Sequence, residues 1–444
     1  MSYLPQLLFV LVIAFSAYIL YRRISGIRRN ILFGKKLDRT DNPSERFRRM
    51  LLIAFGQKNM FKNLIPAVLH LFVYVGFVII NLEVLEFIID GIAGTHRIFA
   101  PYLGTAYSYS INFFEFLAVS VIISCIIFLW RRNVTKVTRF TSTEMTSWPR
   151  LDANLILITE IILMFAILIM NATDQILQNR EVIQYPQTGH LFFSGFLMGA
   201  FQGFETGSLI IIERTAWWFH IIGILGFAIY VTYSKHLHIF LAFPNTYYSN
   251  LEVKGKMINM DSVTNEVKIM LGMPDADTNG TTAPEEIGRF GAKDINDLSG
   301  KNLMDAYSCT ECGRCTAECP ANQTGKKLSP RKIMMDVRDR SEEVGKSLDN
   351  GGKGIQDGKT LLDDYISREE LNACTSCNAC TDACPVLIDP MSIILEMRRY
   401  ISMEESGAPS DWNAMFQNIE TSFSPWKFAP TDRFNWAQGI TKKS

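Results

Sequence analysis

Several features that would mark a self-contained soluble enzyme are missing from this chain. No GxGxxG fingerprint occurs, so nothing in the sequence indicates a flavin or nicotinamide site. The net charge is zero, which excludes a basic nucleic-acid surface spread over the whole chain. Eight of the nine cysteines fall in two short runs, which leaves none for a disulfide framework. The ninth, Cys125, lies in an apolar stretch and is expected to be a small buried side chain.

The two cysteine runs share one pattern, CxxCxxCxxxCP. Three thiolates at i, i+3 and i+6 wrap one corner of an iron-sulfur cubane, and the fourth cysteine of such a run reaches the other cluster. The runs are therefore predicted to exchange their fourth ligands. One [4Fe-4S] cluster is assigned to Cys309, Cys312, Cys315 and Cys384, and the second to Cys374, Cys377, Cys380 and Cys319. Zinc is the competing interpretation, but structural zinc sites pair CxxC knuckles without crowding in a third cysteine.

Five apolar segments are long enough to cross a bilayer, which needs about 20 residues of helix. They lie near residues 3–21, 64–89, 111–130, 153–173 and 209–233. The first has no basic region before it and no cleavage site after it, so we expect a retained anchor. Lysine and arginine gather after the first and third segments, which predicts an N-terminus outside and the region 244–444 in the cytoplasm. The apolar, glycine-broken stretch before the fifth segment is too short to span and is expected on the outer surface.

Three of the six histidines lie in or beside the apolar segments, at His70, His220 and His238. An imidazole in a membrane helix costs free energy unless it is paired, so each is a functional candidate. His220 and His238 are five helical turns apart and are expected on one face of a single helix, near opposite membrane surfaces. His70 lies at the level of His238, and the pair is predicted to clamp a haem b between two helices. His236 points the other way and is expected not to bind haem.

The outer half of the apolar region offers weaker candidates. His220 has no obvious partner; His96 or His190 could reach it from the outer segments, but simple solvation is the more common role of such a histidine. The second apolar segment also carries acidic residues on one face near its outer end. They either accept protons from quinol oxidation or are solvated at the interface. These acids are Glu83, Glu86 and Asp90.

Two stretches carry a resemblance to a known family. YSKHLHIF, with His220 upstream, is similar to the last helix of the cytochrome b family that includes the nitrate reductase gamma subunit, and AVLHLFVYVGF resembles its second helix. That family binds two haems with two histidines on each helix. Here the outer histidine of the second helix is replaced by NLEVLEF, near Glu83. The resemblance therefore implies the inner haem and does not carry over the outer one.

The second half of the chain divides into three parts. Residues 244–287 are rich in Asn, Asp, Gly, Thr and Pro and are predicted to be a linker. Residues 288–402 resemble the ferredoxin modules of heterodisulfide-reductase-like proteins, with a helical stretch after each cysteine run, which favours an α-helical two-cluster domain. Together with residues 1–243, this predicts an all-α protein: a five-helix transmembrane bundle followed by a cytoplasmic ferredoxin-type 2x[4Fe-4S] domain.

Residues 403–444 carry aromatic side chains among Pro and polar residues, with no evident periodicity. Such a segment either grips a partner surface or folds back to shield a cluster. The chain resembles subunits of membrane heterodisulfide-reductase-like and sulfite-reduction-associated complexes. In fused relatives, a stretch similar to residues 403–444 leads into cysteine-rich catalytic domains. The resemblance therefore favours binding of a partner over shielding of a cluster. No adjacent Cys-Cys pair occurs here, so we expect those domains on a separate subunit.

The resemblance implies a membrane subunit that passes electrons between the quinone pool and a cytoplasmic cysteine-rich catalytic partner, through haem b and two [4Fe-4S] clusters. Chemistry on a soluble substrate is then expected in the partner. One alternative is a haem-free iron-sulfur anchor for a soluble dehydrogenase. Another is a redox sensor, which would need an output module that the sequence does not show. The expected contacts are membrane lipid, quinone and the partner subunit, with no nucleic acid.

Overall fold

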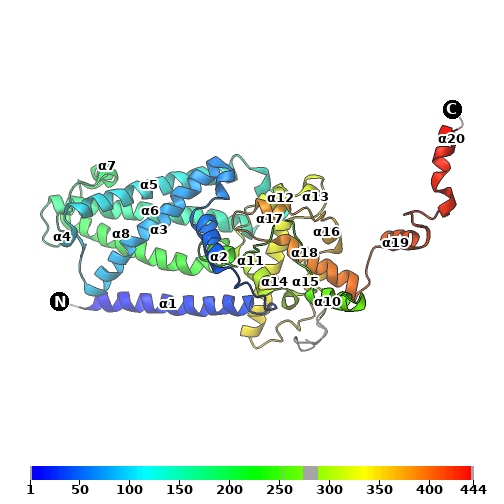
Figure 1. Cartoon of the computed structure of the whole chain (residues 1–444). Helices are drawn as coiled ribbons and strands as arrows, with labels where there is room; N and C mark the ends of the chain where they lie inside the picture. The colour runs from blue at the N-terminus through cyan, green and yellow to red at the C-terminus, as the bar shows by residue number, and fades with distance from the viewer. Residues whose placement is uncertain (1–2, 254, 274–288, 442–444) are drawn as a thin grey trace.

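The computed structural model describes residues 3–253, 255–273 and 289–441, and this part of the chain is helical without a β-strand. Within this described part, five helices are long and apolar enough to span a membrane, as predicted. They are α1 (Leu4–Ile31), α3 (Leu64–Ala93), α5 (Thr105–Asn133), α6 (Trp148–Asn179) and α8 (Thr206–Val231). Figure 1 shows them side by side, with the N-terminus at one end of the bundle and the cysteine-containing domain at the other.

The bundle is held by aliphatic and aromatic side chains that the five helices share. Phe9 of α1 packs on Trp217 of α8, with ring centroids 5.4 Å apart, and α3, α5 and α6 contribute most of the other buried side chains of this core. The first helix extends ten residues beyond the predicted segment, to Ile31. The added residues contact the cysteine-containing domain and are not needed to cross the lipid bilayer. Arg29, for example, donates to the carbonyl oxygen of Gly345 at 3.0 Å.

The fifth spanning helix ends sooner than the sequence suggested. Helix α8 stops at Val231, and a 3-10 turn η5 (Lys235–Leu237) precedes a separate helix α9 (His238–Tyr247). The break is stabilised locally: Ser234 is extended and its hydroxyl accepts the backbone N–H of His236, while Asp152 accepts the backbone N–H of Lys235 at 3.3 Å. The expectation that His220 and His238 share one continuous helix face is therefore wrong.

Short elements close the end of the bundle that lies away from the cysteine-containing domain, which we call the outer end (Figure 1). Helix α7 (Phe192–Phe201) occupies the glycine-broken stretch at this end. Its first N–H groups are capped by a buried carboxylate of α5, since Glu115 accepts from Phe193 at 3.0 Å and Ser194 at 3.2 Å. Helix α4 (Ala100–Leu103) completes this end.

Basic loops and short helices join the bundle to the second domain. They comprise α2 (Pro43–Met50), the π-helix η1 (Leu51–Phe55), and the 3-10 helices η2 (Met60–Lys62), η3 (Thr138–Phe140) and η4 (Thr143–Met145). The loop containing η3 and η4 packs against the cysteine domain, where the fully buried Arg331 donates to Ser142 at 2.9 Å and to Glu144 at 2.7 Å. The basic loops therefore lie on the side that carries the cysteines.

The cysteine-containing domain is a compact set of short helices around one apolar core. Its elements are η6 (Ile295–Asp297), α11 (Gly300–Ser308), α12 (Arg314–Ala317), α13 (Pro320–Gln323), α14 (Pro330–Asp349), α15 (Leu361–Asp364), α16 (Arg368–Asn372), α17 (Ala379–Ala383), α18 (Pro390–Arg399) and the π-helix η7 (Tyr400–Glu404). Capping is explicit in the sequence, because Ser299 and Ser367 each open a helix with a reciprocal capping box. This confirms the predicted all-α domain, with a helix after each cysteine run.

Two regions expected to be irregular contain helices. Helix α10 (Asp261–Met270) lies within the predicted linker, of which residues 274–287 are outside the described part. The tail forms α19 (Ser410–Ser422), η8 (Pro430–Ala437) and α20 (Gln438–Thr441), which extend away from the body in Figure 1. The statement that the tail lacks periodicity is wrong, because Trp412, Phe416, Ile419 and Phe423 recur at helical spacing.

Candidate functional site: two cysteine sites and a pair of facing histidines

The two cysteine runs fold into loops with the same backbone geometry. In each run the second residue after the first cysteine is left-handed, with φ of 54° at both Glu311 and Ser376. The fourth residue is left-handed too, with φ of 71° at Gly313 and 65° at Asn378. This conformation turns backbone N–H groups toward the thiol: Glu311 donates to Sγ of Cys309 at 3.4 Å, and the equivalent bond in the second run has the same length.

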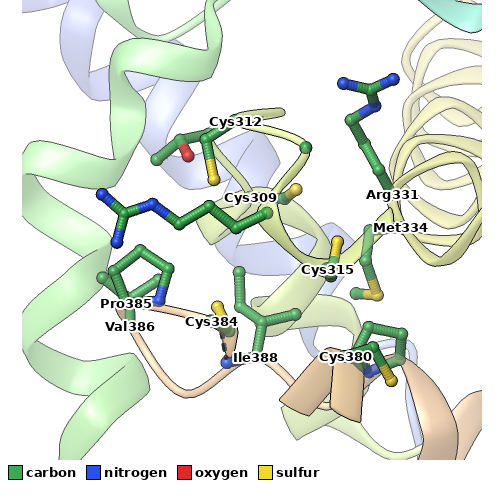
Figure 2. Close-up of a pocket in the computed structure, with 14 residues that line it drawn as sticks. Cys309, Cys312, Cys315, Arg331, Met334, Cys380, Cys384, Pro385, Val386 and Ile388 are labelled. Atoms are coloured by element: carbon green, nitrogen blue, oxygen red, sulfur yellow. Dashed lines mark hydrogen bonds between the residues drawn. The ribbon is translucent and has the colours of Figure 1, made fainter. Parts of the chain in front are cut away.

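The first cysteine site draws on both runs. A small cavity is lined by the first three cysteines of one run together with the last two cysteines of the other, Cys380 and Cys384. Figure 2 shows their sulfur atoms around a common space, whereas the sulfur of Cys380 points away from it. Helices α11 and α12 position the first three cysteines, and the turn after α17 brings in the fourth. We call this the first cysteine site; it consists of Cys309, Cys312, Cys315 and Cys384.

The other four cysteines of the two runs differ in their exposure to solvent. Cys319 belongs to the domain core and Cys374 packs against that core. Cys377 is exposed and Cys380 is buried. The sequence predicts that these four cysteines bind the second cluster, and we call the set the second cysteine site; its members are Cys319, Cys374, Cys377 and Cys380.

Buried thiols in these sites favour the neutral form without a cation nearby. Burial raises the pKa of Cys309 to about 12, and it raises the pKa of Cys380 to about 12 as well. Thiolates at these positions therefore require positive charge in direct contact, which iron ions supply. Four cysteine sulfurs line one space, which is the donor type that an iron-sulfur cubane needs, while no three Cys, His, Asp or Glu side chains of the described residues converge on a site for a single metal ion.

His70 and His238 come together at the end of the bundle nearest the cysteine domain, as the sequence predicted. Their ring centroids are 6.4 Å apart and the ring planes differ by 39°. Bonds from imidazole nitrogen to a transition metal are about 2.0 Å long, which places a ring centre about 3 Å from the metal. Two imidazoles on opposite sides of one metal would thus have centres about 6 Å apart. The observed spacing fits a shared metal centre such as a haem iron.

The ring nitrogens of this pair are oriented for such a role. Nδ1 of His70 lies 3.1 Å from Oε1 of Gln57, and Nδ1 of His238 lies 3.1 Å from the carbonyl oxygen of Lys235. Each Nδ1 therefore carries the proton, which leaves Nε2 as the free donor atom. Burial also lowers the pKa of His238, which favours the neutral ring that binds metals. The roles of Gln57 and Lys235 were not predicted from the sequence, because a single Gln in a loop belongs to no recognisable pattern.

His236 is close to this pair without facing His70. Its ring lies 5.3 Å from that of His238 and 5.7 Å from that of Phe227, centroid to centroid. The expectation that His236 points the other way assumed one continuous helix, but α8 ends at Val231 and the ring of His236 lies beside that of His238.

His220 lies in a different place, in a mid-bundle cavity of about 60 Å³. Its Nδ1 is 3.0 Å from the carbonyl oxygen of Leu163, while its Nε2 is buried without a partner among the described residues. Across the cavity α3 presents the apolar Ile80 and Val84, and α6 presents Glu160. The cavity is lined by one histidine, so the described residues around it do not form a second bis-histidine site.

The suggested outer partners of His220 are placed elsewhere. His96 is engaged through both nitrogens, by Asp174 at 3.3 Å and Arg214 at 3.0 Å. His190 packs beside Gly195 at the start of α7. Neither is a partner of His220: His190 is exposed, in agreement with simple solvation, whereas His96 is half-buried.

The acidic residues of α3 are buried rather than solvated. Glu86 accepts from the hydroxyl of Tyr107 at 2.7 Å, and Asp90 accepts the backbone N–H of Arg97 at 2.8 Å. Both carboxylate oxygens of Glu83 are buried without a hydrogen-bond partner in the described chain. These side chains belong to a polar region inside the outer half of the bundle.

Comparison with known proteins identifies the cysteine region. Residues 308–388 match the family model of a 4Fe-4S dicluster domain. The chain is 28% identical to a probable iron-sulfur-binding oxidoreductase, FadF, of Bacillus subtilis over 97% of its own length and 60% of that relative. It is 24% identical to the EtfAB:quinone oxidoreductase of Syntrophomonas wolfei, over 90% of its own length and 55% of that relative.

A shorter match is to a heterodisulfide reductase component. One component of the ferredoxin:CoB-CoM heterodisulfide reductase of Methanosarcina mazei is 32% identical over 97 residues, which are 22% of this chain and 46% of that protein. No solved structure matches. The chain spans about 60% or less of the two long relatives. It is an iron-sulfur protein with a C-terminal 4Fe-4S dicluster domain, apolar helices that could cross a membrane, and similarity to electron-transfer oxidoreductases.

Proposed function

We propose that this chain is the membrane electron-transfer subunit of an oxidoreductase, and that it connects quinone in the bilayer with a cytoplasmic partner. The proposal rests mainly on the facing pair His70 and His238, whose ring centroids are 6.4 Å apart, and on the four cysteine sulfurs around the cavity of the first cysteine site. The similarity to a named quinone oxidoreductase over 90% of the chain supports the membrane substrate.

Each part of the chain has a distinct task in this proposal. Bound haem b and two [4Fe-4S] clusters would supply one-electron transfer. His70 and His238 would hold the haem iron, the first cysteine site would hold one cluster, and the second cysteine site would hold the other. The apolar bundle keeps water from the histidines, and buried thiolates and their backbone N–H donors set the cluster environment.

The orientation and the partner follow from the same arrangement. Basic loops lie on the side of the cysteine domain, which supports a cytoplasmic location for that domain at the inner membrane. The domain carries the exposed Cys377, which supports an electron exit toward a soluble surface. The similarity to a component of a heterodisulfide reductase supports a cysteine-rich iron-sulfur partner, and catalysis on the final substrate is assigned to that partner.

The test is spectroscopic and uses the purified, anaerobically prepared protein in detergent. We expect a low-spin b haem in the optical spectrum, two reduced [4Fe-4S] signals in electron paramagnetic resonance, and reoxidation of both cofactor types by added menaquinone. Clusters without any haem would instead indicate the haem-free anchor for a soluble dehydrogenase. Haem and clusters that fail to exchange electrons with any quinone would contradict the membrane substrate.

A further inference from the structure

One lysine connects the facing histidines with the first cysteine site. The carbonyl oxygen of Lys235 lies 3.1 Å from Nδ1 of His238. Its ammonium group is 2.5 Å from the carboxylate of Glu311, the residue that immediately precedes Cys312 in the cysteine loop. A single residue therefore contacts a candidate haem ligand through its backbone and a cluster loop through its side chain.

A second connection runs through the other histidine. Gln57 is 3.1 Å from Nδ1 of His70. Asn59 lies two positions after Gln57 in the same loop. Its side chain donates to the carbonyl oxygen of Cys384 at 3.4 Å, and its backbone carbonyl oxygen accepts from Arg314 at the same distance. Both sides of the histidine pair thus reach the first cysteine site through short segments of chain.

The lysine connection is enclosed in protein. Lys235 is 8% exposed, and its two carboxylate neighbours Glu311 and Asp152 are each 3% exposed by side chain. Arg338 completes the group by contacting Glu311 at 2.9 Å. Burying such charges is costly unless the geometry is maintained, so the group resists relative movement of the two domains.

Helix α17, which contains Cys380 and ends just before Cys384, contacts the membrane domain in a different way. Lys62 pairs with Asp382 of α17 at 2.9 Å, and each side chain is 47% exposed. An exposed ion pair of this kind is weak and screened by salt. The connection from His238, which is buried at Lys235 and Glu311, and the partly buried connection from His70 lead instead to the first site.

We propose that Lys235 and Gln57 are positioning residues that fix the facing histidines and the first cysteine site as one unit, which makes the first cluster the direct electron partner of the haem. The second cluster, with Cys377 at the surface, is then the exit. This inference rests on the proposed function. In each transfer one electron leaves one centre, which is oxidised, and enters the other, which is reduced, with no bond made or broken.

Replacing Gln57 and replacing Lys235 are expected to change the midpoint potentials of different centres, and with opposite signs. An imidazole whose Nδ1–H donates to an acceptor is a more basic ligand and stabilises the oxidised metal. Gln57→Leu removes one acceptor and should raise the haem midpoint potential while the first cluster keeps its own. Lys235→Met retains the backbone carbonyl but removes a positive charge beside the cysteine loop, which should lower the potential of the first cluster.

Redox titrations of the full-length protein, followed by electron paramagnetic resonance, test the assignment. Glu311→Gln should shift the first cluster in the direction opposite to Lys235→Met, and Lys235→Arg should restore the wild-type value. Arg29→Met is the matched control, because Arg29 joins the two domains through Asp349 and Gly345, away from the cysteine loops. It should leave both potentials unchanged.

The outcomes separate the inference from the function beneath it. If Lys235→Met fails to assemble, Gln57→Leu and Glu311→Gln still give shifts of defined sign. Haem and first-cluster potentials that stay at wild-type values in both of those variants would overturn the positioning role, as would a shift confined to the second cluster. A wild-type protein with clusters and no low-spin haem would defeat the proposed function itself.

Discussion

The rings of His70 and His238 face each other with centroids 6.4 Å apart, although they come from α3 and from the start of α9. Helix α8 alone does not bring them together, because it ends before Lys235. The break between Val231 and His238 turns the chain so that His238 points at α3. The approach of these two rings therefore depends on the helix end as much as on the spacing of histidines.

The first prediction concerns this pair. Replacing His70 or His238 by Ala should abolish the low-spin haem signal, because one axial nitrogen is lost in each variant, while both cluster signals persist. Optical and electron paramagnetic resonance spectra of the purified variants provide the measurement. His236→Ala is the matched control and should retain the haem. Full haem content in both of the first two variants would show that the ligands lie elsewhere.

A second prediction follows from the crossed arrangement of cysteines. Cys319→Ser should damage the cluster at the second cysteine site, because Cys319 lies in the run of the first site but does not line the cavity that contains Cys384. Cys384→Ser should damage the first cluster instead. Electron paramagnetic resonance of the reduced variants distinguishes the two signals. Loss of the cluster held by each cysteine's own neighbours would refute the exchange.

Features that depend on hydrophobic periodicity or on a fixed spacing of residues could be predicted from the sequence. Five apolar runs predicted five spanning helices, and the repeated cysteine pattern predicted an all-α two-cluster domain. These signals are local, because each depends on residues within about one helix or loop. The approach of Cys384 to the first run was also accessible, since it follows from how such runs share ligands.

Features that depend on tertiary contacts were not readable. The end of α8 is set by Asp152, which accepts the backbone N–H of Lys235 from another helix. The roles of Gln57 and Glu311 depend on partners brought from distant segments. The helix α19 was missed for another reason: its aromatic residues do recur at helical spacing, but Pro and polar residues on either side obscured the pattern.

A third prediction concerns the ion pair between Arg331 and Glu144, one of several that join the two domains. Although burial alone would raise it, hydrogen bonds from Arg331 and Ser329 hold the pKa of Glu144 below its ordinary value of 4.5. Arg331 is fully buried, so Glu144→Ala should cost about 3 kcal/mol at pH 7 by leaving a buried charge without its partner. Denaturant unfolding followed by tryptophan fluorescence measures the loss.

The pH dependence of that pair has a definite sign. A carboxylate whose folded pKa is lowered stabilises the fold above its unfolded pKa, and the contribution is lost as pH falls through the folded value. The difference between wild type and Glu144→Ala should therefore be complete near neutral pH and shrink below pH 4.5. Lys62→Met breaks an exposed pair and should change stability by less than about 1 kcal/mol. A difference that grows in acid would contradict the assignment.

The last prediction concerns the tail, whose aromatic side chains are exposed. Along α19, Trp412 and Phe416 are 43% and 47% exposed, and Trp426 beyond it is 67% exposed. Figure 1 shows α19 and α20 extending away from the cysteine domain rather than lying over it. This arrangement favours a partner-gripping role over the shielding role, because a row of apolar side chains in water is typical of an interface.

Removing residues 409–444 isolates that role, because the cut spares Glu404 and Glu405, which contact Phe290 and Arg368 of the cysteine domain. We expect haem and cluster contents close to wild type, together with loss of the copurifying partner subunit and of electron transfer to it. Lys427→Met within the tail is a control that leaves the apolar row intact and should keep the partner. A truncated protein that still copurifies with its partner at full stoichiometry would contradict the docking role, and loss of the clusters on truncation would favour shielding, since the tail would then exclude water from them.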